Sequence, residues 1–151
     1  MKRILMTLGS VFSLIIAAFG VLGVKAYFAS YQNNTFAVAA VEEISEHWSI
    51  NRLGNIVHPN LLKMANKPDG ERAFRIFRQY GAFERAERVH QTGYVVEYGA
   101  GATGTVQFVG HFENGTANIT VKVHEADGVR TVLGLHMEPL HIKERLPEVT
   151  S

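Results

Sequence analysis

Between Thr105 and Met137 the sequence reads TVQFVGHFENGTANITVKVHEADGVRTVLGLHM, and apolar and polar residues alternate along most of it. Alternation with a period of two places apolar side chains on one face of a strand. Two turn-forming stretches, Asn114-Gly115 and residues 125–129, interrupt the alternation. The pattern predicts a three-stranded antiparallel meander, and the rest of the domain is expected to cover its apolar face.

The first predicted turn is Asn114-Gly115. Asn-Gly favours a type I′ turn, because both central residues of that turn need positive φ. This turn pairs Glu113 with Thr116 and places Phe108 opposite Val121. The apolar face then carries Val106, Phe108, Gly110, Phe112, Ala117, Ile119, Val121 and Val123.

The second predicted turn lies between Glu125 and Val129. A two-residue loop at Asp127-Gly128 would set Ile119 opposite His136 and so exchange the two faces. A three-residue loop from Ala126 to Gly128, with Gly128 as a left-handed bulge residue, restores the match. This loop is therefore expected, and it pairs Ile119 with Leu135.

Composition indicates one folded domain and an additional N-terminal segment, in a chain of 151 residues with 46% hydrophobic and 19% charged content. The net charge of +1 argues against general electrostatic attraction to nucleic acid, which is not expected as a partner. The chain has no Cys, which excludes disulfides and thiol catalysis.

The N-terminal segment has the pattern of a membrane anchor. Lys2 and Arg3 precede an uncharged, apolar run over residues 4–24. About 20 apolar residues cross a bilayer, whereas the apolar part of a cleaved signal is typically about 7–15 residues long. We therefore expect residues 1–26 to anchor the chain in the membrane. The alternative is secretion after cleavage behind Ala26.

Charge around this run predicts the orientation of the anchor. Positive groups are more numerous before the run than after it, where only Lys25 stands nearby. The positive-inside rule then places the N-terminus in the cytosol. In a bacterium, the chain would be a single-pass inner-membrane protein with a periplasmic domain.

Residues 27–35 are polar and are expected to form a spacer, with the domain over residues 36–139 and a loose tail over residues 140–151. Helical periodicity predicts a helix from Phe36 to about Ile50, with one apolar stripe and with Thr35 or Asn34 as its N-cap. The stripe consists of Ala37, Val41, Ile44 and Trp48. Further helices are expected over residues 59–65 and 71–80, and a first strand over residues 88–98.

Several motifs suggest chemistry without supporting it. Residues 99–104 match Gly-x-Gly-x-x-Gly, but a strand follows, whereas dinucleotide binding needs a helix there. His111, Asn118 and His136 share one row of the predicted sheet, with the histidines about 9–10 Å apart, which is too wide for zinc. Arginines recur every third residue from Arg72 to Arg78, which is usually a solvated helix face. No cofactor, metal or catalytic residue is assigned.

The element order resembles the NTF2-like superfamily of cone-shaped α+β domains. The resemblance covers about residues 36–139 and rests on a long helix ending near Trp48, the sequence His58-Pro59, and Tyr80-Gly81 before a curved antiparallel sheet. It implies an α+β fold with a helical layer on the sheet. It also implies comparison with the membrane-anchored assembly factors of bacterial secretion systems, which have one span and a periplasmic domain.

We therefore expect a non-enzymatic interaction or assembly module that binds itself, as a possible dimer, or other envelope proteins. Its expected interaction face is Val109, His111, Asn118, Thr120, Val132, Gly134 and His136. The alternative is a cone that binds a small apolar molecule or lipid. Its expected pocket is Trp48, Phe74, Phe77, Tyr94, Phe108, Val121 and Leu135. An enzyme of unrecognised type is a weaker alternative.

Overall fold

The computed structural model describes residues 29–49, 54–97 and 99–142. The chain divides into two units, Met1–Gln32 and Asn33–Ser151, and the second contains the fold. This unit is α+β, as the sequence predicts. Its helical segments are residues 33–47 of a longer helix, α2 (Pro59–Ala65) and α3 (Pro68–Phe77), which a short 3-10 helix, η2 (Arg78–Tyr80), extends.

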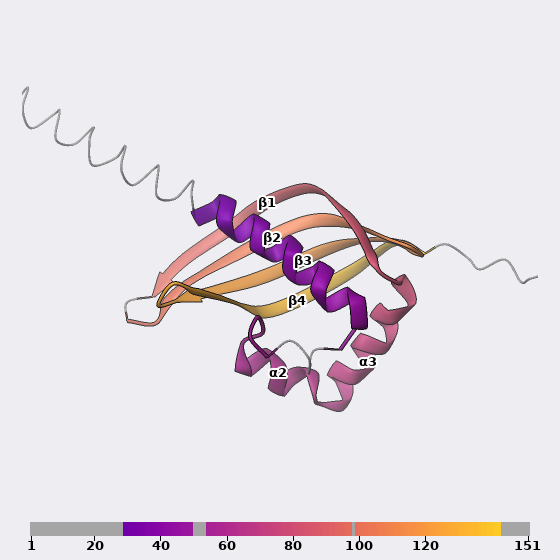
Figure 1. Ribbon diagram of the computed structural model, residues 1–151, viewed down its shortest axis with the longest axis horizontal. Helices are drawn as coiled ribbons and strands as arrows, with labels where there is room; N and C mark the ends of the chain where they lie inside the picture. The colour runs from indigo at the N-terminus through magenta and orange to yellow at the C-terminus, as the bar shows by residue number, and fades with distance from the viewer. Residues whose placement is uncertain (1–28, 50–53, 98, 143–151) are drawn as a thin grey trace, which may run out of the picture. The chain divides into compact units, whose positions relative to one another are not determined.

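The sheet is open, antiparallel and four-stranded, in the order β1-β2-β3-β4. Its strands are β1 (Phe83–Glu97), β2 (Gly101–Phe112), β3 (Gly115–Ala126) and β4 (Val129–Ile142). Residues 33–47 run across one face of the sheet. Helices α2 and α3 lie beside the β4 edge and near the C-terminal end of this helix (Figure 1). We call the helix-covered side the inner face and the opposite side the outer face.

The long helix begins earlier than the sequence predicts, because residues 29–35 of the expected spacer are helical. The periodicity of apolar residues does not extend to this part. Instead, Asn33 is 2% exposed, donates to Gln91 Oε1 at 3.0 Å, and accepts from Arg130 Nε at 3.2 Å. Polar contacts with the sheet therefore continue the helix before Phe36, and neither Asn34 nor Thr35 is its N-cap.

The predicted helix over residues 59–65 is confirmed, with Pro59 in its first turn and the His58 side chain accepting from the N–H of Asn60. The next helix starts at Pro68 rather than at Glu71, so three of the five residues of the expected loop over residues 66–70 are helical. Gly70 allows this start. A Cβ there would stand 2.5 Å from the carbonyl oxygen of Met64, which lies in the neighbouring helix.

The first hairpin has the predicted faces but not the predicted pairs. Phe108 lies opposite Ile119, so the register is displaced by two residues from the expected one. The loop is Glu113-Asn114, and neither residue has positive φ. Its N–H groups donate to the carbonyls of Ala82 and Tyr80, at 3.0 and 2.9 Å. Contacts with a distant segment, rather than local turn preference, therefore place this turn.

The second hairpin has a two-residue loop, Asp127-Gly128, instead of the predicted three-residue loop. Asp127 and Gly128 have φ values of 52° and 77°, which fits a type I′ turn. The faces are nevertheless preserved, because a register shift between Lys122 and Val123 leaves Leu133 as an extra residue in β4. Ile119 consequently faces Met137, and the predicted pair with Leu135 is wrong.

Strand β1 begins at Phe83, earlier than the predicted Arg88, and the Gly-rich loop is shorter than predicted because Gly101 to Gly104 belong to β2. At the other end, β4 includes residues 140–142 of the expected tail. Among the described residues, no helix is long and apolar enough to span a membrane. The apolar run over residues 4–24 lies outside that part of the chain.

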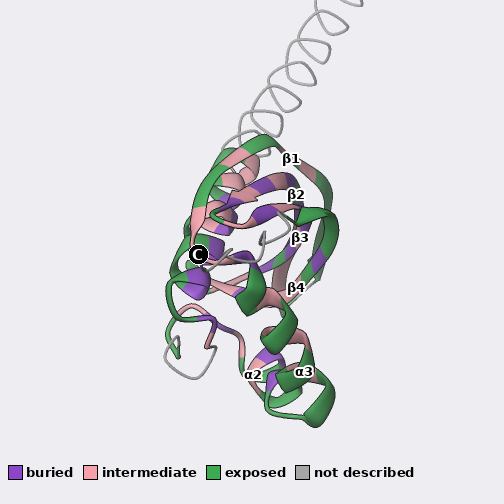
Figure 2. Cartoon of the chain, turned by 90° about the vertical axis from the view of Figure 1, so that its right-hand side faces the viewer, coloured by how far each residue is buried: buried purple, intermediate pink, exposed green. Residues whose placement is uncertain are grey.

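The core lies between the inner sheet face and the helices, and the predicted helical stripe is buried there. Phe112 is 1% exposed and joins the elements, with its ring 5.7 Å from Trp48, 5.6 Å from Tyr80 and 5.5 Å from Phe83. Figure 2 shows buried positions recurring along β2 and β3, the two central strands of the sheet.

Candidate functional site

The expected ligand pocket is mostly filled with side chains. Phe108 and Val121 are 3% and 0% exposed and belong to the core, and Leu135 packs against it. Tyr94 stands apart from the others near the end of β1 and is 42% exposed. Trp48 and Phe74 line an open space beside the helices, whereas Phe77 packs against both of their rings.

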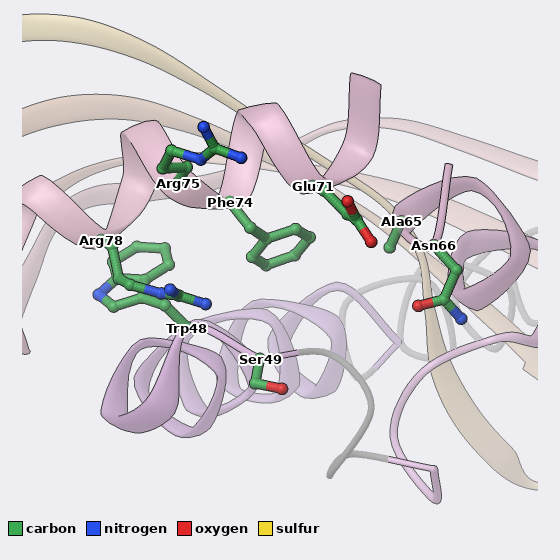
Figure 3. Close-up of a pocket in the computed structure, with 8 residues that line it drawn as sticks. All are labelled: Trp48, Ser49, Ala65, Asn66, Glu71, Phe74, Arg75 and Arg78. Carbon is green, nitrogen blue, oxygen red and sulfur yellow. The ribbon is translucent and has the colours of Figure 1, made fainter. Parts of the chain in front are cut away.

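That space is a hollow of about 300 Å³ between the C-terminal end of the long helix and the α2–α3 pair. Its lining residues are Trp48, Ser49, Ala65, Asn66, Glu71, Phe74, Arg75 and Arg78. Figure 3 shows the side chain of Arg78 beside the Trp48 ring, and Glu71 toward the other end, near Asn66. Trp48 and Phe74 are among the predicted pocket residues, whereas the charged residues Glu71, Arg75 and Arg78 are not.

Trp48 is held firmly at this hollow. Its Nε1–H donates to the carbonyl of Gly81 at 2.8 Å, and its ring lies 5.9 Å from that of Phe77. The residue has a φ of 42°, which is uncommon for a bulky side chain. Tertiary contacts therefore maintain a backbone conformation that Trp48 would rarely adopt alone.

A cluster of hydrogen-bonded polar side chains lies between the long helix and the sheet, and the sequence did not predict it. Asn33 links Gln91 of β1 with Arg130 of β4, and Arg130 also pairs with Glu125 at 2.8 Å. Gly104 makes room for it, because a Cβ there would stand 2.6 Å from the Asn33 amide nitrogen. Each of these side chains has a partner within the fold, so the group ties the helix to the sheet.

The outer face carries most of the expected interaction residues. Val109, His111 and Thr120 are half-buried there, whereas Asn118 and His136 are exposed. Gly134 lies opposite Lys122 on the same face. The expected row of His111, Asn118 and His136 is wrong, since these residues pair with Thr116, Glu138 and Thr120 respectively.

Val132 is not on the outer face. It is 0% exposed and belongs to the core, because the extra residue Leu133 changes the phase of β4 at this point. The sequence placed Val132 by continuing a regular alternation, and a bulge inverts that alternation.

The outer face contains a second hollow, of about 390 Å³, over the middle of the four strands. Val109, Asn118 and Thr120 of the expected face line it. So do four residues that the sequence did not single out: Arg88, His90, Gln107 and Glu138. Arg88 and His90 stand on β1 and Glu138 stands on β4, so basic and acidic groups flank opposite sides.

An irregularity in β1 presents Arg88 at this hollow. The register shifts between Glu87 and His90, and Arg88 has a φ of 56°. Next to it, Glu87 contacts Arg85 and lies 3.3 Å from His111 Nε2. Glu87 is engaged by these two groups, and the Arg88 guanidinium forms no ion pair with any residue that the structure describes.

Among the described residues, Tyr80 carries the one clear pKa shift. Burial raises the pKa of the Tyr80 hydroxyl, which lies within the core. Over the same residues, no three His, Cys, Asp or Glu side chains gather as they would around a metal ion. The two hollows are the candidate binding sites of this part of the chain.

The chain was compared with known proteins. No protein-family model, no curated protein and no solved structure matches it.

Proposed function

We propose that this chain is a membrane-tethered, non-enzymatic interaction module with an NTF2-like fold, which binds a projecting segment of another envelope protein on the outer face of its sheet. The apolar run over residues 4–24 is the proposed tether, with the domain outside the cytosol. The proposed role is assembly rather than catalysis.

The outer hollow is the observation that carries this proposal. All described helices of the folded unit lie on the inner face or beside it, so no described element covers the hollow (Figure 1). Half-buried Val109 and Thr120 form its base, with the amides of Gln107 and Asn118 beside them. A base of this kind offers both apolar contact and hydrogen bonds.

Its charge pattern indicates the chemistry of the partner. Arg88 stands on one side and Glu138 on the other. A concave surface accepts a convex one, so a second copy of the same hollow is a poor fit. A projecting segment with an acidic residue toward Arg88 and a basic residue toward Glu138 would satisfy both charges, and such complementarity mainly sets specificity and association rate.

Photo-crosslinking in the host membrane tests this proposal with the full-length chain. A benzophenone amino acid at position 120 should give one discrete adduct with another protein, whereas the same group at exposed Lys63 of α2 should not. Arg88→Glu and Glu138→Lys should each reduce the adduct at least severalfold. Arg75→Glu, a matched charge reversal on α3, should leave it unchanged.

An adduct that forms equally from positions 63 and 120 would contradict the proposal. So would an adduct that is insensitive to both charge reversals. An adduct of twice the chain's own mass would show instead that a second copy occupies the hollow.

The hollow beside Trp48 favours a second candidate function, the binding of an amphiphile with an anionic head. Phe74 and Trp48 supply an apolar wall, and Arg78 supplies a cation at the rim. Trp48 is the single tryptophan, so its fluorescence reports directly on the hollow. Decanoate should change that fluorescence saturably, and Arg78→Glu should abolish the change. An unaltered spectrum in the unsubstituted chain would exclude this ligand class.

A further inference from the structure

The open sheet has two edges, β1 and β4, and they are protected to very different degrees. An exposed edge presents unpaired N–H and C=O groups that can pair with another chain. Natural proteins block such edges with bulges, charged residues, proline or a covering segment. An edge stretch without these features is therefore a candidate site for strand pairing.

The β4 edge is covered at Val132 and is interrupted by two register shifts and by Pro139. The N–H of Val132 donates to the carbonyl of Ile56 at 2.7 Å, and its carbonyl accepts from the N–H of His58 at 2.9 Å. Val57 thus forms a parallel bridge beside Val132. Further along, Pro139 has no N–H to donate, which leaves only three strand residues beyond it.

The first half of β1 is protected as well. Its register shifts between Phe83 and Arg85, between Glu87 and His90, and between Gln91 and Gly93. Exposed charged residues also crowd this half, among them Glu84 and Arg88. Bulges and charges together make this part a poor template for another strand.

The last part of β1, residues 93–97, has none of these features except one terminal charge. Its five residues pair regularly with β2, from Gly93 opposite Thr105 to Glu97 opposite Gly101. Tyr94, Val95 and Val96 are 42%, 58% and 69% exposed, although their residue types favour strands and burial. Among the described residues β1 pairs only with β2, so the other side of this stretch is open.

We propose that residues 93–97 pair antiparallel with the same residues of a second copy of this chain, which joins two sheets into one continuous eight-stranded sheet. This inference goes beyond the proposed function and uses a different surface. In the joined sheet, both inner faces lie on the same side only if each residue of one β1 strand is paired with a residue of the other β1 strand whose side chain points to the inner or outer face in the same way. Centring the pairing on Val95 meets that condition.

This register is self-complementary. Tyr94 of each copy then faces Val96 of the other, which is a favourable aromatic and β-branched cross-strand pair. Val95 faces its own counterpart. Glu97 faces Gly93, so the only charge in the stretch meets no like charge. The exposed apolar side chains and the open backbone groups are therefore satisfied by one partner.

The difference between the edges also limits the size of the assembly. If β4 were as open as β1, copies could add head to tail into a fibre. Because the segment around Val57 and the proline at position 139 block β4, each copy has one usable edge. Two copies paired through β1 have no free site left, so the product is a closed dimer.

The mass of the full-length chain in mild detergent tests the proposal. The unsubstituted chain should be a dimer, and Val95→Lys should be a monomer, because two opposed lysines would meet at the centre of the pairing. Val129→Lys is the matched control, since Val129 is 59% exposed and Val95 is 58% exposed. The control should remain a dimer. A monomeric parent chain, or a Val95→Lys chain that stays dimeric, would overturn the proposal.

Cysteine crosslinking gives an independent test, because the chain contains no natural Cys. Directly opposed residues in adjacent strands have Cβ atoms about 4.5–5.5 Å apart, close to the range of a disulfide. Val95→Cys should therefore form a covalent dimer under mild oxidation, at least tenfold faster than Val129→Cys. Equal rates for the two variants would show that residues 93–97 do not meet across a dyad.

Discussion

Tyr80 shows at the scale of one residue how burial outweighs a polar group. The residue is 1% exposed, and its hydroxyl is buried without a hydrogen-bond partner among the residues that the structure describes. An unsatisfied buried hydroxyl costs free energy, whereas its ring contributes to the aromatic cluster around Phe112. The ring, rather than the hydroxyl, therefore accounts for this residue's contribution to stability.

Tyr80→Phe should consequently leave the free energy of unfolding unchanged or raise it by up to about 1 kcal/mol, because it removes the unpaired hydroxyl and keeps the ring. Urea denaturation of the two chains measures the difference. Tyr80→Ala is the control and should lower stability by about 3–5 kcal/mol through loss of the ring. A Phe variant that is less stable by more than about 1 kcal/mol would mean that the hydroxyl has a partner.

The same residue predicts a pH dependence. Burial raises the pKa of Tyr80 above its ordinary value of 10.0, so above that pH the unfolded chain loses its tyrosine proton while the folded chain retains it. Unfolding then releases a proton, and the free energy of unfolding falls as pH rises. Between pH 10 and the folded-state pKa, the parent chain should lose stability more steeply than Tyr80→Phe. Parallel pH profiles would contradict this expectation.

At the scale of the elements, the two hairpins use glycine for different reasons. Gly128 has a φ of 77°, and a Cβ there would meet no atom within 4 Å. Gly115 does not have positive φ, but a Cβ there would stand 2.4 Å from the carbonyl oxygen of His141 in β4. One glycine thus supplies a backbone conformation, and the other allows two strands to approach closely.

Asparagine distinguishes these two roles because it tolerates positive φ but carries a Cβ. Gly128→Asn should lower the free energy of unfolding by less than about 1 kcal/mol. Gly115→Asn should lower it by about 1–3 kcal/mol, since β4 must move away. Chemical denaturation of both variants tests this pair. Equal losses would show that turn conformation, and not close approach, explains Gly115.

At the scale of the whole molecule, Phe112 connects the parts of the core. Its ring contacts Trp48 at the end of the long helix, Tyr80 after α3, and Phe83 at the start of β1. Adjacent to it, the N–H groups of the Glu113-Asn114 turn donate to the carbonyls of Ala82 and Tyr80. Helices and sheet therefore meet at one buried position.

Phe112→Ala should lower the free energy of unfolding by about 3–5 kcal/mol, because it leaves a cavity where three elements join. Ile119→Val is the control in the same core and should cost about 0.5–1.5 kcal/mol. Denaturation followed by far-ultraviolet circular dichroism and by Trp48 fluorescence measures both losses. The two probes should give one coincident transition in the parent chain, and separate transitions would show that helices and sheet unfold independently.

Periodicity in the sequence correctly indicated which side of β2, of β3 and of β4 after its bulge faces the core, but it placed Val132, before that bulge, on the wrong face. Apolar residues recur with a period of two, and the register error of the first hairpin is two residues, so Phe108 and Ile119 lie on the predicted face. Local signals also located α2, because Pro59 suits the first turn of a helix. The aromatic side of the hollow beside Trp48 followed from helical periodicity.

The positions of the turns and the pairing of residues across the strands depend instead on tertiary contacts. Hydrogen bonds to the segment around Tyr80 place the first turn. The second turn is one residue shorter than predicted, and an extra residue in β4 restores the alignment of the strand faces. That bulge moves Val132 into the core, and the irregularity near Arg88 brings a positive charge to the outer hollow. Such features depend on contacts between residues far apart in the chain, and periodicity within one segment carries no information about them.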